Sequence, residues 1–190
     1  ETGATARGVQ IDQGATVGSL LNAGTISAGV TGSSGSAIAI QDLSGTLTSI
    51  ENTKFITAVT TVSDTTLTNT AKAIALDLQA NTTGVSIHQT GINDGDDGAD
   101  GVADTDTDAD GVDDADEPTI VGQILLGSGA DSLRIDNGTV VGDIAFGAGA
   151  NLLAIDGGAT VTGKITADAG TLALSIGSGE LTVKNAASLN

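Results

Sequence analysis

The residues best suited to chemistry lie in one acidic stretch, residues 93–117, where aspartate recurs at alternate positions. This stretch holds twelve of the 24 Asp and Glu residues of the chain and no Lys or Arg. From Asp106 onward, the sequence DTDADGVDDADE fits the D-x-[DN]-x-[DN]-G-x5-E pattern of a calcium-binding loop at every required position. The pattern predicts Ca²⁺ as the cofactor, because carboxylate oxygens suit this hard cation and no His or Cys lies nearby to favour zinc.

The loop pattern assigns a role to each predicted ligand. Alternate carboxylates converge on the ion, Gly111 supplies the sharp turn, a backbone carbonyl points inward, and a last acid closes the site with both oxygens. The predicted ligands are Asp106, Asp108, Asp110, Val112 (carbonyl), Asp114 and Glu117. A weaker copy ten residues upstream predicts a second ion, with the ligands Asp96, Asp100 and Asp104. The alternative interpretation is a solvated acidic linker without an ion.

These tandem DxDxDGxxD units resemble thrombospondin type-3 calcium repeats and the short linkers of that kind in bacterial surface proteins. The resemblance covers only the acidic stretch. Its flanks differ from a true EF-hand, because residues 87–91 lack the pattern of an amphipathic helix and Pro118 directly follows Glu117. A second calcium pattern, the G-x-G-x-D-x-U-x nonapeptide, is echoed at residues 127–133, where a plain glycine turn is the alternative.

The acidity of the chain is local. The formal charge is −18, but the residues outside the acidic stretch carry twelve acids and six bases, a balance of −6. Six scattered Lys and Arg provide no basic face for phosphate, so nucleic acid is excluded as a partner. No apolar run approaches 18 residues, and we expect no membrane insertion of this segment. The absence of both a signal peptide and an obvious end cap indicates a piece of a longer protein.

Short repeated strands must position the acidic stretch. The pattern of residues 127–146 repeats in residues 147–166, and a decayed third copy covers residues 167–183. The apolar residues alternate at period two, which is typical of strands, and glycines mark the corners. The expected glycine matches are 127 with 147, 129 with 149, 138 with 158, and 142 with 163. We expect Ile135 to stack on Ile155 and Ile144 on Ile165, inside the molecule.

The first half of the chain repeats more loosely. Residues 20–26 match residues 50–56 at an offset of thirty, and residues 67–74 look like a third version with one extra residue. Residues 37–40 and 73–76 share another strand pattern. Fixed periods of this size with glycine at the corners are typical of a β-solenoid, an all-β rod of stacked parallel strands. The predicted organisation is one continuous rod, with residues 1–92 as its first half, 93–118 as an acidic calcium-binding insertion, and 119–190 as its second half.

The N-x-GTI turns and the GxGAD-L-I-D-G-x-V-x-G-x-I repeats resemble the passenger domains of Gram-negative autotransporters, over residues 8–90 and 119–185. The resemblance implies a right-handed parallel β-helix at the cell surface, used as an adhesin or as a spacer with inserted loops. It also implies anchoring to the outer membrane through a C-terminal barrel that this sequence does not contain. The implied partners are calcium, a protein or glycan on a host or neighbouring cell, and further copies of the rod.

Catalysis is the rival hypothesis. His88 is the only histidine, and its strand pattern turns it to solvent, away from Val85 and Ile87. The chain contains no G-x-S-x-G, HExxH or Walker motif. Asp136 and Asp156 lie twenty residues apart, so adjacent repeats could bring them to about 4.8 Å, near the spacing of retaining glycosidases. A polysaccharide-cleaving β-helix is therefore the alternative, but we expect a structural protein rather than an enzyme, because sugar-binding grooves usually carry aromatic residues.

Overall fold

Three parallel β-sheets make up the structure, a computed structural model that describes residues 3–62, 66, 68–92, 105–167 and 169–183 and the backbone of residues 188–189. Sheet A consists of β1 (Ala4–Ile11), β4 (Gly35–Asp42), β7 (Lys72–Asp77), β10 (Gln123–Leu125), β13 (Ile144–Phe146), β16 (Ile165–Ala167) and β19 (Ser188–Leu189). Sheet B consists of β2 (Ser19–Asn22), β5 (Ser49–Asn52), β8 (Ser86–Gln89), β11 (Ser132–Ile135), β14 (Ala150–Ile155) and β17 (Thr171–Ile176). Sheet C consists of β3 (Thr25–Thr31), β6 (Phe55–Thr61), β9 (Thr119–Val121), β12 (Thr139–Val141), β15 (Thr160–Thr162) and β18 (Glu180–Thr182).

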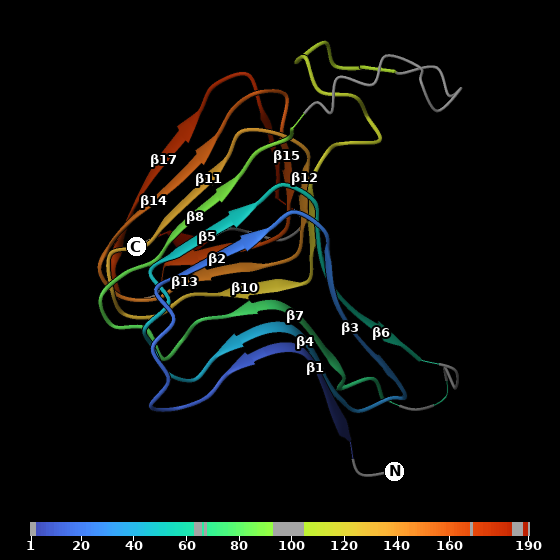
Figure 1. Cartoon of the computed structure of the whole chain (residues 1–190), viewed down its shortest axis with the longest axis vertical. Helices are drawn as coiled ribbons and strands as arrows, with labels where there is room; N and C mark the ends of the chain where they lie inside the picture. The colour runs from blue at the N-terminus through green and yellow to red at the C-terminus, as the bar shows by residue number, and fades with distance from the viewer. Residues whose placement is uncertain are drawn as a thin grey trace.

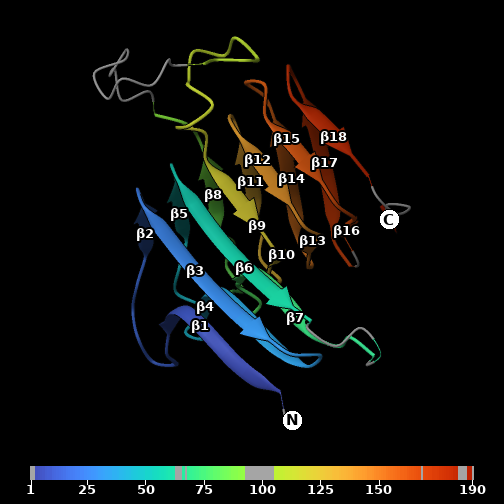
Figure 2. The same ribbon diagram turned by 90° about the vertical axis from the view of Figure 1, so that its right-hand side faces the viewer.

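The chain visits the three sheets in turn. Three consecutive strands, one from each sheet, form what we call a coil, from coil 1 (β1–β3) to coil 6 (β16–β18). Each strand pairs in parallel with its counterparts in the neighbouring coils, so the coils lie side by side along the long axis (Figures 1 and 2). The described residues form no helix, and therefore none with the length and apolar character of a membrane-spanning helix. This all-β arrangement is consistent with a parallel β-helix or solenoid.

The register confirms the stacking that the repeats predict. Ile135 pairs with Ile155 and Ile144 with Ile165, and all four side chains are buried. They belong to one apolar cluster that includes residues from every coil. The cluster forms because alternate residues of each strand face inward, where the next coil covers them.

Two details of the predicted repeats are wrong. Ile50 pairs with Ile87, not with a residue of the 67–74 segment, so the third copy of that pattern is β8. The mismatch arises because 37 residues separate Ile50 from Ile87, against 30 between Leu20 and Ile50, and because Gln89 stands where the earlier copies carry asparagine. In the second half Gly138 stands opposite Ala159 rather than Gly158, since Thr139 pairs with Thr160. The extra residue of that repeat lies at the corner before β15, where the chain turns through Gly157 and Gly158, both with positive φ.

Coils 1 and 2 are wider than coils 4 and 5, and coil 3 combines a six-residue strand in sheet A with a three-residue strand in sheet C. Leu20 pairs with Ile50, thirty residues later, whereas Leu133 pairs with Leu153, twenty residues later. The additional chain extends β1, β3, β4 and β6 beyond the three-sheet core, where β3 packs on both β1 and β4 (Figure 2). At the ends of coils 3, 4 and 5 the chain instead turns from sheet C to sheet A at a glycine: Gly122, Gly142 and Gly163. At one of these corners, Gly142, an added Cβ would collide with the backbone carbonyl of Gly122.

The corner between sheets B and C contains two different columns of stacked side chains. In coils 1 to 3, the Asn22 amide donates to Asn52 Oδ1 at 2.8 Å, and the Asn52 amide donates to Gln89 Oε1 at 3.1 Å. In coils 4 to 6 the same register position holds Ile135 and Ile155, which are buried, and Ile176, which is exposed. We call these the amide column and the isoleucine column.

The acidic insertion leaves the rod after β8 and returns at β9. β8 pairs with β5 and β11, and β9 pairs with β6 and β12, so both sheets pass the insertion without a gap. The Gln89 amide ties the two ends together, because it donates to the backbone carbonyls of Asn137 at 3.0 Å and Pro118 at 3.3 Å. The rod thus holds the base of the insertion at the B–C corner.

Candidate metal centre and the groove beside it

Hydrogen bonds close the described part of the insertion, residues 105–118, into a tight loop. The Asp114 amide donates to the carbonyl of Thr105 at 2.7 Å. In return, the backbone N–H and the hydroxyl of Thr107 donate to the two carboxylate oxygens of Asp114, at 2.9 and 2.6 Å. These bonds hold the pKa of Asp114 below its usual value. Asp114 therefore acts as the internal fastener of the loop.

Within this loop the first three predicted ligands come together. The Asp106 carboxylate accepts backbone bonds from Asp110 at 3.2 Å and Gly111 at 2.9 Å, which curls the chain around it. Ala109 and Gly111 adopt left-handed backbone conformations, with φ of 60° and 94°. As a result, one carboxylate oxygen from each of Asp106, Asp108 and Asp110 lies within 4.8 Å of the other two. Three oxygens at this spacing can share one cation.

The electrostatics of the loop favour a positive ion. Desolvation, followed by the neighbouring carboxylate of Asp110, raises the pKa of Asp108. Glu117 is half-buried, and desolvation is the main cause that raises its pKa as well. Repulsion from four other carboxylates of the loop, Asp108 foremost, adds to the effect. A raised carboxyl pKa means that the folded loop disfavours the charged form, through desolvation first and repulsion second, and a cation between the carboxylates relieves the repulsion.

The other predicted ligands are placed as follows. Among the described residues, the group of three converging carboxylates does not include Asp114 or Glu117. The Val112 amide donates to Asp110 Oδ1 at 2.9 Å, and its side chain lies against Gly91 of the rod. The predicted second site lies outside the described residues, since its ligands are Asp96, Asp100 and Asp104.

Three rod residues that the sequence analysis did not assign to the calcium site contact the loop. The Asn137 amide donates to Asp110 Oδ2. Asp108 lies so close to Gly158 that a Cβ at that glycine would collide with the carboxylate. Lys54 forms an ion pair with Asp116. No local sequence signal marks these residues, because they come from different coils and meet the insertion only at the B–C corner.

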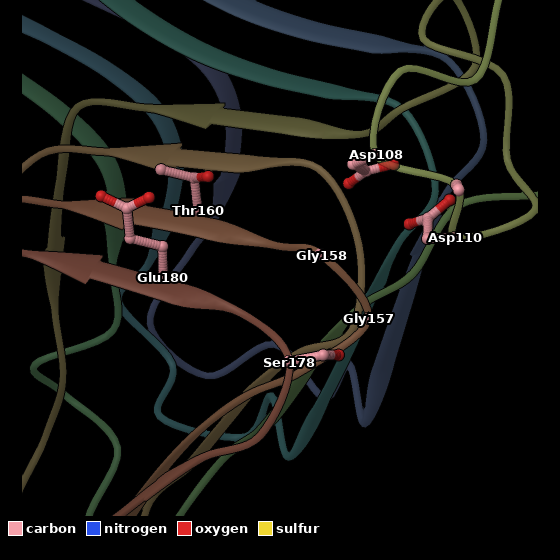
Figure 3. Close-up of a pocket in the computed structure, with 8 residues that line it drawn as sticks. Asp108, Asp110, Gly157, Gly158, Thr160, Ser178 and Glu180 are labelled. Carbon is pink, nitrogen blue, oxygen red and sulfur yellow. The ribbon is translucent and has the colours of Figure 1, made fainter.

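A groove of about 640 Å³ lies between the loop and the rod. Asp108, Ala109 and Asp110 line one wall, and residues of coils 5 and 6 line the other: Gly157, Gly158, Thr160, Ser178 and Glu180. Figure 3 shows the Asp108 and Asp110 carboxylates beside the Gly157–Gly158 corner, with Thr160 and Glu180 on the neighbouring strands. The groove gives solvent and ions access to the converging carboxylates from the rod side.

Asp136 and Asp156, the pair that the enzymatic alternative would use, each form hydrogen bonds with neighbouring residues. Asp136 Oδ2 accepts from Arg134 at 2.5 Å and contacts His88 Nε2 at 2.9 Å, so the histidine is paired on the outer face of sheet B. Asp156 Oδ1 accepts from the Ser178 backbone at 3.0 Å and its hydroxyl at 2.8 Å, and also from Gly157. The bonds from Ser178 are the main reason that the pKa of Asp156 falls to about 2.

Comparisons with protein-family models, with curated proteins and with solved structures find no match to this chain.

Proposed function

We propose that the protein is a structural segment of a cell-surface rod, a right-handed parallel β-helix whose acidic insertion binds calcium. The observation that carries the proposal is the convergence of the Asp106, Asp108 and Asp110 carboxylates within 4.8 Å, in a loop that also fits the calcium pattern. The repeats support the rod, because each coil buries its apolar residues only by stacking on its neighbours. The resemblance to autotransporter passengers supports an extracellular location and a role in extending or presenting an adhesin.

The charges of the insertion explain why an ion would matter. Without a cation, twelve acids within 25 residues repel one another. Calcium neutralises that repulsion and couples binding to folding of the loop. Calcium sites in extracellular modules bind at roughly 10⁻⁴ to 10⁻³ M, which suits the calcium concentration outside cells.

A structural role also fits the aspartates that an enzyme would use. A glycosidase needs one carboxyl group with a raised pKa to act as the general acid. The pKa of Asp156 is instead lowered to about 2, chiefly by Ser178 of the next coil. Asp136 is held by Arg134 and His88. These contacts favour a structural role, in which the aspartates join neighbouring coils, and not a catalytic pair. A glycan-cleaving activity that Asp136→Ala abolishes would overturn the structural proposal.

Isothermal titration calorimetry of the full chain tests calcium binding. We expect heat on titration with CaCl₂ and, in parallel, slower proteolysis of residues 93–117. Asp108→Asn removes one converging carboxylate with little change in shape, and we expect it to weaken binding at least tenfold, because the remaining two carboxylates hold the ion less strongly. The matched control is Asp12→Asn, which removes one charge from an exposed position on coil 1. Millimolar calcium without heat or protection would leave the insertion as a charged linker.

A further inference from the structure

We propose that the calcium-loaded insertion braces the rod, by tying coils 2 to 5 together along the B–C corner. This inference rests on the proposed calcium site and goes beyond it, because it assigns the ion an effect on strands that supply no calcium ligand. Calcium would then control the integrity of the rod and not only the order of the loop.

The contacts of the insertion follow the long axis of the rod. Asp116 pairs with Lys54, which follows β5 in coil 2. Val112 lies against Gly91, which follows β8 in coil 3. The contacts described above continue to Asn137, between β11 and β12 in coil 4, and to Gly158, between β14 and β15 in coil 5. Four consecutive coils therefore present the same corner to one loop.

Two of these contacts are made by candidate calcium ligands. Asp110 accepts from Asn137, and Asp108 sits against Gly158. Because an ion shared by the two carboxylates fixes their positions, it also fixes the loop to coils 4 and 5. When the ion leaves, the repulsion among the carboxylates acts directly on the same two contacts.

Asn137 is buried where the loop meets coil 4. The residue is 3% exposed, and its Oδ1 atom is buried without a hydrogen-bond partner among the described residues. Its other amide atom, Nδ2, is the one that contacts Asp110. Its side chain is therefore enclosed between two contacts of the loop, with Nδ2 bonded to Asp110 and Oδ1 beside Gly91, where Val112 packs.

The coupling is reciprocal. If calcium strengthens the docking of the loop on the rod, docking strengthens calcium binding by the same factor. The Lys54–Asp116 pair lies outside the converging carboxylates. It therefore keeps the loop near the corner when calcium is absent, so that the brace can form again.

Hydrogen exchange measured by mass spectrometry on the full chain, in calcium or in a chelator, tests the brace. At calcium near ten times its Kd, we expect exchange of β11, β12, β14 and β15 to slow by about tenfold, because binding stabilises the docked state by the factor 1 + [Ca]/Kd. Asn137→Ala removes the link to coil 4, and we expect it to abolish most of this calcium-dependent slowing. The matched control is Asn151→Ala, a buried corner asparagine that bonds to Asp131 and to carbonyls of residues 147–149. It should speed exchange equally with and without calcium.

The outcomes separate the brace from the binding site. If calorimetry shows calcium binding but exchange of the four strands does not change, the brace is wrong and the binding site stands. If calorimetry shows no binding, both fail. If Asn137→Ala does not fold, Val112→Ala on the insertion decides, because it weakens the contact with Gly91 and leaves the contacts within the rod intact. Full calcium-dependent slowing in Val112→Ala, or in a folded Asn137→Ala, would overturn the brace.

Discussion

Coils 1 and 2 and coils 4 and 5 stack in the same three sheets but use different amounts of chain and different corners. A wide coil continues β3 or β6 past the core and covers the extension with β1 or β4. A narrow coil ends a three-residue strand at a glycine and begins the next sheet almost at once, as at Gly142 between β12 and β13. The narrow coil thus depends on the absence of a side chain at its corner, whereas the wide coil depends on an added layer of packing.

The columns at the B–C corner differ in a corresponding way. Each amide of the amide column needs its neighbour in the next coil, since Asn52 accepts from Asn22 and donates to Gln89. The isoleucine column needs only apolar contact. A buried polar column therefore fixes which coil lies above which, whereas an apolar column tolerates replacement by other apolar side chains of similar shape. The change from one to the other falls between Gln89 and Ile135, on either side of the insertion.

The largest expected effect comes from placing an amide in the isoleucine column. Ile155→Asn removes a side chain that is 1% exposed and buries an amide with no amide above or below it. We expect a loss of about 4–6 kcal/mol in the free energy of unfolding, from lost apolar burial and unsatisfied polar atoms together. Urea denaturation followed by far-UV circular dichroism measures it. Ile155→Val serves as the control and should cost about 1 kcal/mol; similar losses in the two variants would show that the column accepts amides.

The next effect concerns the corners. At Gly142, φ is 156° and an added Cβ would meet the Gly122 carbonyl, so Gly142→Ala should destabilise the rod by roughly 2–3 kcal/mol. Gly24 lies at a corner of coil 1 with no atom within 4 Å of the corresponding Cβ, and Gly24→Ala should stay within about 0.5 kcal/mol of the parent. Thermal unfolding of both variants makes the comparison. Equal stability of the two variants would contradict the glycine dependence of the narrow coils.

The smallest expected effect concerns a buried carboxylate, that of Asp131. Asp131 of coil 4 lies beside Asn151 of coil 5, which accepts a bond from the Asp131 amide at 3.0 Å. Asp131 is 1% exposed, Oδ1 accepts from Val85, and Oδ2 is buried without a partner among the described residues. Asp131→Asn keeps the acceptor and removes the buried charge, so we expect a gain of roughly 1 kcal/mol at pH 7.

The pH dependence of that gain has a definite sign. Burial raises the pKa of the Asp131 carboxyl above its usual value. The folded state therefore holds this proton more tightly than the unfolded state does, and the associated stability is full below the unfolded pKa and lost as pH rises through the folded pKa. The advantage of Asp131→Asn should accordingly grow from acid to neutral pH in urea titrations. An advantage that is constant with pH would show that the charge is not its cause.

Part of this architecture is visible in the sequence. The recurrence of Gly127 at Gly147 and of Ile135 at Ile155 predicts the narrow coils and their register, because each narrow coil repeats both its glycines and its apolar residues at nearly constant spacing. The position of β8 (Ser86–Gln89) could not be predicted in this way. Its Ile87 lies 37 residues after Ile50, and Gln89 replaces an asparagine, so neither spacing nor residue type repeats.

The candidate site divides in the same manner. The convergence of Asp106, Asp108 and Asp110 follows from local spacing, since alternate side chains and a glycine turn act within one short segment. The contacts with Asn137 and Gly158 could not be predicted, because they depend on how the loop settles against coils that are distant in sequence. Asp114 shows the limit even within the loop, where a bond to Thr107 engages a carboxylate that the pattern assigns to the ion.

The unequal coil lengths also have a mechanical consequence. Strands in neighbouring coils are joined by hydrogen bonds along the rod, so tension between the two ends peels coils away one at a time. Coil spacing sets the length released at each step, at about 3.4 Å per extended residue. The twenty residues between Leu133 and Leu153 correspond to about 70 Å, and the thirty between Leu20 and Ile50 to about 100 Å. A rod with unequal coils therefore yields in unequal steps, and the longest step, the 46 residues between Ile87 and Leu133, contains the acidic insertion.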